Sequence, residues 1–308
     1  MKALLTITLI AICSLTIAQD FTEKQVEIGG LKGTLSTPNK KTKTAILLIA
    51  GSGPTDRNGN SAMGFVNNSL KMVSENLASA GYAVLRYDKR GIAESKKAVE
   101  NPATIRFDQF VDDARSWLNF LKNEGYKKLI IAGHSQGSLV GMLAAQNNEN
   151  VKAFISISGL SENAGDAIVR QLGAQSEELA MDARINIDSM KAGYSVNKYS
   201  PYLISLFGPA IQPFLKSYMA YTPNDEIKKL SIPILLVNGS TDIQVGIDQA
   251  QSLKESYPDA ELIILEGMNH ILKDAPLDPG ANMATYNNPD LPLSDGLMSG
   301  IISFIQKL

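Results

Sequence analysis

A serine between two glycines is the part of this sequence best suited to chemistry. Residues 133–137 read Gly-His-Ser-Gln-Gly; an apolar run at 128–132 precedes them, and 138–145 have the pattern of a helix. A Gly-x-Ser-x-Gly at a strand-to-helix turn is the nucleophile elbow, whose strained backbone lifts the serine hydroxyl to where a substrate can reach it. We therefore predict that Ser135 is a nucleophile and that the backbone amide of Gln136, at the helix N-terminus, faces a developing oxyanion.

A histidine and an aspartate that could assist this serine follow two later apolar runs. A serine hydroxyl is a poor nucleophile until an imidazole takes its proton, and a carboxylate holds that imidazole in the right tautomer. The chain has two histidines; His134 is inside the elbow, which leaves His270, after the run at 262–265, as the base. Asp242 follows the run at 234–237 and is the predicted acid. The order serine, acid, histidine is the one expected with such an elbow.

Three other aspartates could supply the carboxylate, but each fits the pattern less well. Asp225 precedes its strand, Asp248 falls in a predicted helix, and Asp274 follows the histidine. Asp242 could itself be an ordinary turn residue, because aspartate favours turns. The sequence favours Asp242 because it directly follows the end of a predicted strand, where catalytic residues of open α/β sheets gather.

The composition is that of a globular protein with a large core. Of the 308 residues, 44% are hydrophobic and 19% are charged, and the formal net charge is −2. This apolar fraction argues against disorder, and so small a net charge predicts neither nucleic acid nor an anionic membrane as a partner. We expect no cofactor and no metal, because the sequence has no phosphate-binding Gly-x-x-x-x-Gly-Lys-[Ser/Thr] and no zinc-binding cluster of His and Cys.

The N-terminal residues have the pattern of an export signal. One lysine precedes a nearly apolar stretch at 3–12, and Thr-Ile-Ala at 16–18 resembles a signal-peptidase site. We expect residues 1–18 to be a bacterial Sec signal peptide and the mature protein to be secreted or periplasmic. A transmembrane anchor is the alternative, which the short apolar run disfavours. Cleavage would remove Cys13, the only cysteine, and with it any thiol chemistry.

The rest of the chain alternates between strand and helix patterns, with one interruption. We expect strands at 26–28, 31–36, 44–50, 82–87, 128–132, 151–158, 234–237 and 262–265, and helices at 67–80, 108–123, 138–145 and 295–306. Between 160 and 230 the strand pattern stops and the residues look helical. The aromatics there are Tyr194, Tyr199, Tyr202, Phe207, Phe214, Tyr218 and Tyr221. They could line a pocket or form the segment's own core, because aromatic side chains serve in both.

This pattern resembles the α/β-hydrolase fold over essentially all of the mature chain. Residues 86–95 look like that family's Asp-x-Arg-Gly-x-Gly-x-Ser turn after the fourth strand, with Ala93 in place of the second glycine. The resemblance implies a mostly parallel central sheet flanked by helices, with a core made of 19–159 and 231–308. It also implies a helical cap at 160–230, inserted after the sixth strand, which we expect to roof the active site.

The loop at 50–60 narrows the resemblance. It is similar to the Gly-Ser-Gly-Pro-Thr-Asp-Arg-Asp-Gly-Asn loop of bacterial carboxylesterases of the EstD type, which are related to serine aminopeptidase-like (S33) hydrolases, with Asn58 in place of the second Asp. The resemblance implies that the amide of Ser52 is the second oxyanion donor. Asp56 and Arg57 could pair to hold the loop or could touch substrate, and we expect pairing.

These features together predict a serine hydrolase that cleaves carboxylic esters, with short to medium acyl or aryl groups, through an acyl-enzyme. A peptidase or amidase with the same triad is the first alternative, because the two activities differ only in pocket shape and in protonation of the leaving group. A non-catalytic binding protein with this fold is the second, although such proteins usually lack a triad member. The oligomeric state is left open.

Overall fold

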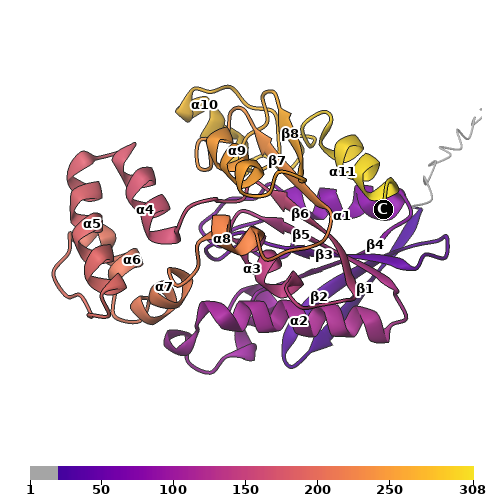
Figure 1. The fold of residues 1–308 in the computed structure, drawn as a ribbon, viewed down its shortest axis with the longest axis horizontal. Helices are drawn as coiled ribbons and strands as arrows, with labels where there is room; N and C mark the ends of the chain where they lie inside the picture. Colours follow the sequence, from indigo (N-terminus) through magenta and orange to yellow (C-terminus); the bar gives the residue numbers. More distant parts are fainter. Residues whose placement is uncertain (1–19) are drawn as a thin grey trace, which may run out of the picture.

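The computed structural model describes residues 20–308, and its centre is one eight-stranded β-sheet (Figure 1). The strands are β1 (Phe21–Ile28), β2 (Leu31–Pro38), β3 (Thr44–Ile49), β4 (Ala83–Tyr87), β5 (Lys128–His134), β6 (Val151–Ile157), β7 (Ile234–Gly239) and β8 (Glu261–Leu265). Their order across the sheet is β1-β2-β4-β3-β5-β6-β7-β8. β2 pairs antiparallel with both β1 and β4, and all the other neighbouring strands pair in parallel. The predicted fold class, a mostly parallel sheet flanked by helices, is confirmed. The predicted signal peptide at 1–18 lies outside the described residues.

Helices cover both faces of the sheet. The two layers are made by α1 (Ser69–Ser79) and α11 (Leu297–Gln306) on one face, and by α2 (Phe107–Asn123) and α3 (Gln136–Ala145) on the other (Figure 1). Successive strand side chains point to opposite faces, so Ile46 packs with α1 and α11 while Leu47 packs with α2 and α3. Because both faces are covered, the parallel strands are mostly apolar, which is why their runs stand out in the sequence.

The other helical segments lie in the connections. They are η1 (Ala93–Ala98), η2 (Pro102–Thr104), α4 (Ala164–Gly173), α5 (Glu177–Lys191), η3 (Pro201–Leu203), α6 (Ile204–Phe207), α7 (Gln212–Tyr218), α8 (Pro223–Ile227), α9 (Ile247–Ser256), α10 (Pro279–Ala284) and η4 (Thr285–Asn287). Within residues 20–308, none of the helices has the length and apolar character that crossing a membrane requires.

The segment between β6 and β7 is helical and extends to one side of the sheet, at the left of Figure 1. Three of its aromatic side chains pack on α2: the rings of Tyr218 and Phe107 stack with centroids 4.5 Å apart, those of Phe214 and Phe110 are 5.4 Å apart, and Tyr221 also contacts Phe107. Such ring pairs add attraction beyond the burial of apolar area. These three aromatics therefore attach the segment to the layer of α2. The division of the chain at 160–230 stays a prediction.

The edge hairpin is longer than the sequence pattern predicts. β1 begins at Phe21 rather than Val26, and Phe21 lies opposite Pro38. The side chains at 22–25 are polar and exposed, so hydrophobic alternation does not reveal this part of the strand. Backbone pairing with β2, rather than burial, holds it in place.

Candidate active site

Ser135 lies in the tight turn between β5 and α3, and its backbone is strained. Its φ is 53° and its ψ is −123°, outside the regions that residues with a side chain prefer. The flanking glycines are required by close packing. A Cβ on Gly133 would lie 2.2 Å from the carbonyl oxygen of Gly137, and a Cβ on Gly137 would lie 2.4 Å from that of Ile49. The surrounding backbone therefore fixes Ser135 at the carboxyl edge of the parallel strands.

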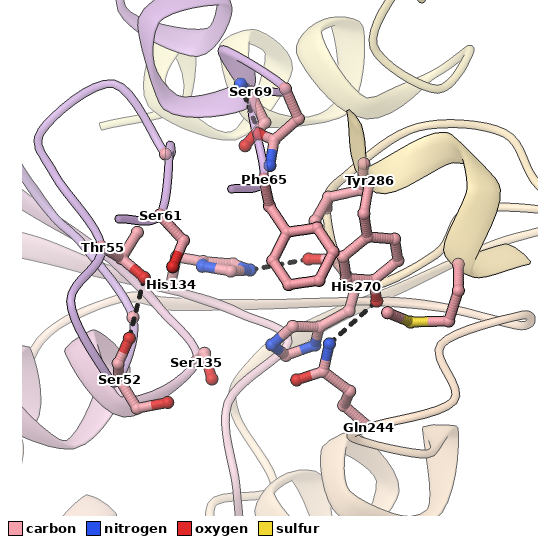
Figure 2. Close-up of a pocket in the computed structure, with 15 residues that line it drawn as sticks. Ser52, Thr55, Ser61, Phe65, Ser69, His134, Ser135, Gln244, His270 and Tyr286 are labelled. Atoms are coloured by element: carbon pink, nitrogen blue, oxygen red, sulfur yellow. Dashed lines mark hydrogen bonds between the residues drawn. The ribbon is translucent and has the colours of Figure 1, made fainter. Parts of the chain in front are cut away.

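His270 and Asp242 form a buried, hydrogen-bonded pair on the loops that follow β8 and β7. Nδ1 of His270 donates to Oδ2 of Asp242 at 2.8 Å. The other carboxylate oxygen accepts the backbone N–H groups of Gln244 and Val245, each at 2.9 Å. Burial alone would raise the pKa of Asp242, but the charge and hydrogen bond of His270 and these two backbone donors hold it below its ordinary value. Asp242 is therefore ionised and fixed, and His270 lines the same cavity as Ser135 (Figure 2).

The rival aspartates lie outside this cavity. Asp225 pairs with Lys228 at 3.4 Å. Asp248 accepts a hydrogen bond from Gln249 at 2.9 Å, and Asp274 forms an isolated bridge in the loop after β8. None of the three lines the cavity at Ser135. Within residues 20–308, no group of three or more His, Cys, Asp or Glu side chains is arranged to hold a metal ion.

His134, the histidine of the elbow, contacts the backbone of His270. Its Nε2 atom donates to the carbonyl oxygen of His270 at 2.8 Å, and the two ring centroids are 4.9 Å apart. Because a carbonyl oxygen only accepts, the proton of neutral His134 must be on Nε2. Burial, assisted by the neighbouring His270, lowers the pKa of His134 to about 3, so the ring stays neutral. His134 thus anchors the loop of His270, a role that the sequence did not reveal because the motif constrains only the backbone there.

The two predicted oxyanion donors come from segments that meet beside Ser135. Gln136 is the first residue of α3, and the N–H of a first helical residue has no acceptor within its helix. The loop after β3 approaches the elbow so closely that a Cβ on Gly51 would lie 3.1 Å from the Cβ of Ser135. Ser52, the next residue, lines the cavity together with Ser135 (Figure 2). Both predicted donors are therefore on backbone next to the serine.

Asp56 and Arg57 hold this loop, but they do not pair with each other. The Oδ1 atom of Asp56 accepts the backbone N–H groups of Asn58 at 2.8 Å and Asn60 at 2.9 Å. Arg57 is buried and forms an ion pair with Glu94. Neither Asp56 nor Arg57 lines the cavity. The expected mutual pair is wrong, because the loop turns the carboxylate of Asp56 back onto its own backbone.

The cavity beside Ser135 has a volume of about 210 Å³, and one of its walls is apolar. That wall is made by Phe65, Ile271, Met283 and Tyr286. The rings of Phe65 and Tyr286 meet edge to face at 6.1 Å, and the Tyr286 hydroxyl accepts a hydrogen bond from Gln244 at 2.9 Å (Figure 2). Sequence reasoning missed these residues because they lie in irregular loops, where no periodic pattern marks the side chains that point inward.

The helical segment between β6 and β7 contributes no residue to the lining of this cavity. Its link to the elbow is Tyr218, whose hydroxyl is hydrogen-bonded to the side chain of Gln136. The expectation that this segment roofs the pocket is therefore not supported by the lining. The walls come instead from the loop that carries Phe65 and from the excursion after β8 that carries Tyr286.

Comparison with known proteins agrees with this architecture. The family model described as serine aminopeptidase, S33, matches residues 65–198. Among solved structures, ferulic acid-bound Est1E from Butyrivibrio proteoclasticus has a TM-score of 0.57 at 17% identity, covering 92% of this chain and 96% of that one. The Pyrococcus furiosus esterase Pf2001 has a TM-score of 0.57 at 16% identity, covering 94% and 91%.

A peptidase is also among the similar structures. A puromycin-hydrolyzing peptidase from Mycobacterium tuberculosis has a TM-score of 0.52 at 18% identity, covering 83% of this chain and 37% of that one. No curated protein sequence matches the chain. Identities this low show a shared fold and leave the substrate open.

Proposed function

The chain has the α/β-hydrolase fold, and we propose that it cleaves carboxylic esters through an acyl-enzyme on Ser135. One observation carries the proposal: the strained serine shares a cavity with His270, and Nδ1 of His270 is hydrogen-bonded to the ionised, buried carboxylate of Asp242. This is the set of roles that nucleophilic catalysis by a serine needs, with the nucleophile, the base and the group that orients the base in one place.

In the acylation step, Oγ of Ser135 bonds to the carbonyl carbon of the ester while Nε2 of His270 accepts the hydroxyl proton. The charge that develops on the carbonyl oxygen is stabilised by the amides of Gln136 and Ser52. Asp242 stabilises the imidazolium that forms. When the tetrahedral intermediate collapses, the bond to the alkoxy oxygen breaks, and His270 gives its proton to the departing alcohol.

Deacylation repeats these steps with water as the nucleophile. His270 takes a proton from the water, and the resulting hydroxide bonds to the acyl carbon. The bond to Oγ of Ser135 then breaks, His270 returns the proton to Oγ, and the carboxylic acid leaves.

The size and lining of the cavity favour a short to medium acyl group or an aryl group. A volume of about 210 Å³ is small, and the wall of Phe65, Ile271, Met283 and Tyr286 is apolar. Apolar burial stabilises a bound group by roughly 25 cal/mol per Å², so each methylene that fits adds affinity until the cavity is full. Two proteins of the same fold are described as an esterase or as binding ferulic acid, which supports an ester as substrate.

A peptidase or amidase is the second candidate, supported by the S33 family model and by the puromycin-hydrolyzing peptidase of the same fold. The decisive experiment is a series of p-nitrophenyl esters from two to sixteen acyl carbons, assayed beside aminoacyl amides of the same amine. We expect ester turnover with an optimum at short or medium chains. Faster turnover of the amides would make the protein an amidase.

Labelling of Ser135 by a fluorophosphonate separates both enzymes from a non-catalytic binding protein. We expect one label per chain in the wild type and none in Ser135→Ala. An unlabelled wild type that is folded would show that the serine is not activated, and the enzyme proposal would fail.

We further propose that residues 1–18 direct export of the protein from a bacterial cell. The support is the sequence pattern alone, one lysine followed by a short apolar stretch and a small-residue cleavage site. The test is the mass of the protein recovered from the periplasm or medium. We expect the mature chain to begin at Gln19, and an intact N-terminus on exported protein would contradict cleavage there.

A further inference from the structure

Lys89 is a buried cation that the proposed mechanism does not use. It lies in the turn after β4 and is 3% exposed. Among the ion pairs found within residues 20–308, its neighbour Arg90 pairs with Asp113, but Lys89 forms none. Burial lowers the pKa of Lys89 to about 7, which shows how unfavourable its charge is at this position. A costly buried charge of this kind is more common at functional sites than elsewhere.

The partners of Lys89 are two carbonyl groups of the loop that approaches Ser135. Its Nζ atom donates to the carbonyl oxygen of Gly51, and also to that of Gly53 at 3.1 Å. The ring of Phe110 lies on another side, with its centroid 5.8 Å from Nζ. The Nζ atom of Lys89 is therefore hydrogen-bonded to the backbone on both sides of Ser52.

The carbonyl of Gly51 and the N–H of Ser52 belong to one peptide group. A trans peptide directs its C=O and its N–H to opposite sides, and the described chain contains no cis peptide bond. When Lys89 draws the carbonyl toward itself, the Ser52 N–H must point away from Lys89. A hydrogen-bond donor held on the carbonyl oxygen also polarises the peptide, which makes its N–H a stronger donor.

From these contacts we propose that Lys89 is a positioning residue for the oxyanion site, acting through the Gly51–Ser52 peptide group. Its hydrogen bond to the Gly51 carbonyl oxygen fixes the plane of that peptide, so that the Ser52 N–H faces the cavity before substrate arrives. The proposal rests on the proposed function, because it concerns the oxyanion of the acylation step. Preorganised donors of this kind do not have to reorient during the reaction, which is the source of their effect.

The test compares Lys89→Met with the matched variant Lys254→Met. Lys254 is half-buried and also donates to two backbone carbonyls, those of Pro258 and Ala260, each at 2.6 Å, but it lies on α9 and does not line the cavity. Removal of one oxyanion donor typically lowers kcat by ~10²–10³-fold. We expect a loss of that order in Lys89→Met with KM within about threefold of wild type, and kcat within about threefold of wild type in Lys254→Met.

A second measurement reports on the oxyanion itself. A trifluoromethyl ketone adds to Ser135 and places a negative oxygen in the site, whereas the corresponding alcohol cannot. We expect Lys89→Met to lower the affinity for the ketone by the same factor as kcat, and to leave the affinity for the alcohol unchanged. Equal ketone affinity in wild type and folded Lys89→Met would overturn the proposal. If Lys89→Met does not fold, Lys89→Gln serves in its place, with a smaller loss expected because the amide still donates.

A third measurement needs no activity. Crystal structures of the wild type and of the Lys89 variant show the orientation of the Gly51–Ser52 peptide directly. We expect this peptide to rotate or to become disordered in the variant, and an unmoved peptide would contradict the proposal. A wild type that neither turns over esters nor binds the ketone would refute the proposed function, while the orientation of the peptide would still decide the role of Lys89.

Discussion

Ser135 keeps a positive φ because its surroundings leave no alternative, and its chemistry depends on two partners that approach from other loops. Ser135→Ala and His270→Ala should each remove nearly all turnover, and the double variant should lose little more, because the residues act as a unit. Asp242→Asn should cost less than either but still roughly 10²-fold or more, since it unsettles the tautomer of His270. Initial rates on the best ester of the series provide the measurement.

Two results would contradict this arrangement of roles. Retention of more than a few per cent of activity by Ser135→Ala would exclude it as the nucleophile. Full activity in Asp242→Asn would transfer the acid role to another carboxylate. Circular dichroism spectra of each variant serve as the control for folding.

His134 is the residue-scale feature with the clearest structural consequence. Its neutral ring donates to the carbonyl oxygen of His270 and so holds the loop of the catalytic base. His134→Phe keeps the ring volume but leaves that buried carbonyl without its donor, which typically costs ~1–3 kcal/mol. We expect a lower melting temperature and a lower kcat, with KM little changed. A variant with wild-type kcat would show that the loop of His270 is held by other contacts.

At the scale of elements, the excursion between β8 and α11 forms one wall of the cavity, and it should govern the acyl preference. Tyr286 is buried, and its ring contacts that of Phe65 in the same wall of the cavity. Tyr286→Ala enlarges the cavity and removes apolar contact. We expect the optimum acyl chain to lengthen and KM for short esters to rise. The matched control is Tyr202→Ala, since Tyr202 is 85% exposed on the segment between β6 and β7.

The outcome that would oppose this assignment is a shift of the acyl optimum in Tyr202→Ala and none in Tyr286→Ala. The selective surface would then belong to the helical segment between β6 and β7, as the sequence led us to expect.

The elements differ in how far the sequence determines them. Strands β3 to β7 and the elbow could be predicted because burial on both faces leaves continuous apolar runs, and because only glycine fits at positions 133 and 137. The wall at Phe65 and Tyr286 could not, since each residue is placed by loop contacts distant in sequence, such as the hydrogen bond from Gln244 to Tyr286. Lys89 was also missed, because a lysine in a polar motif gives no sign of burial.

For the whole molecule, Lys89 makes stability depend on pH above neutrality. Its pKa falls from an ordinary value of 10.5 to about 7 in the folded protein. Between these values the unfolded chain binds more protons than the folded chain, so the free energy of unfolding should rise with pH, by at most ~1.4 kcal/mol per unit. His134 titrates far below this window and does not contribute.

Urea unfolding at intervals between pH 7 and pH 9 measures this effect. The range stops below the region where tyrosines ionise, because burial raises the pKa values of Tyr87 and Tyr218 and their stabilising contribution is lost on the alkaline side. We expect a positive slope in the wild type and a flatter profile in Lys89→Met. Parallel profiles would mean that Lys89 is solvated in the folded protein.

The fluorescence of the only tryptophan reports on the sheet and the helices packed on it, and not on the helical segment between β6 and β7. Trp117 lies on α2, fully buried, with ring centroids 5.8 Å from Tyr87 and 5.5 Å from Phe120. Residues 160–230 contain tyrosines and no tryptophan. Emission from Trp117 should therefore track loss of the sheet, while unfolding confined to residues 160–230 should change tyrosine signals and leave the tryptophan spectrum unshifted. A thermal scan that follows both tyrosine and tryptophan signals would show whether the protein unfolds in one cooperative step or whether residues 160–230 unfold first.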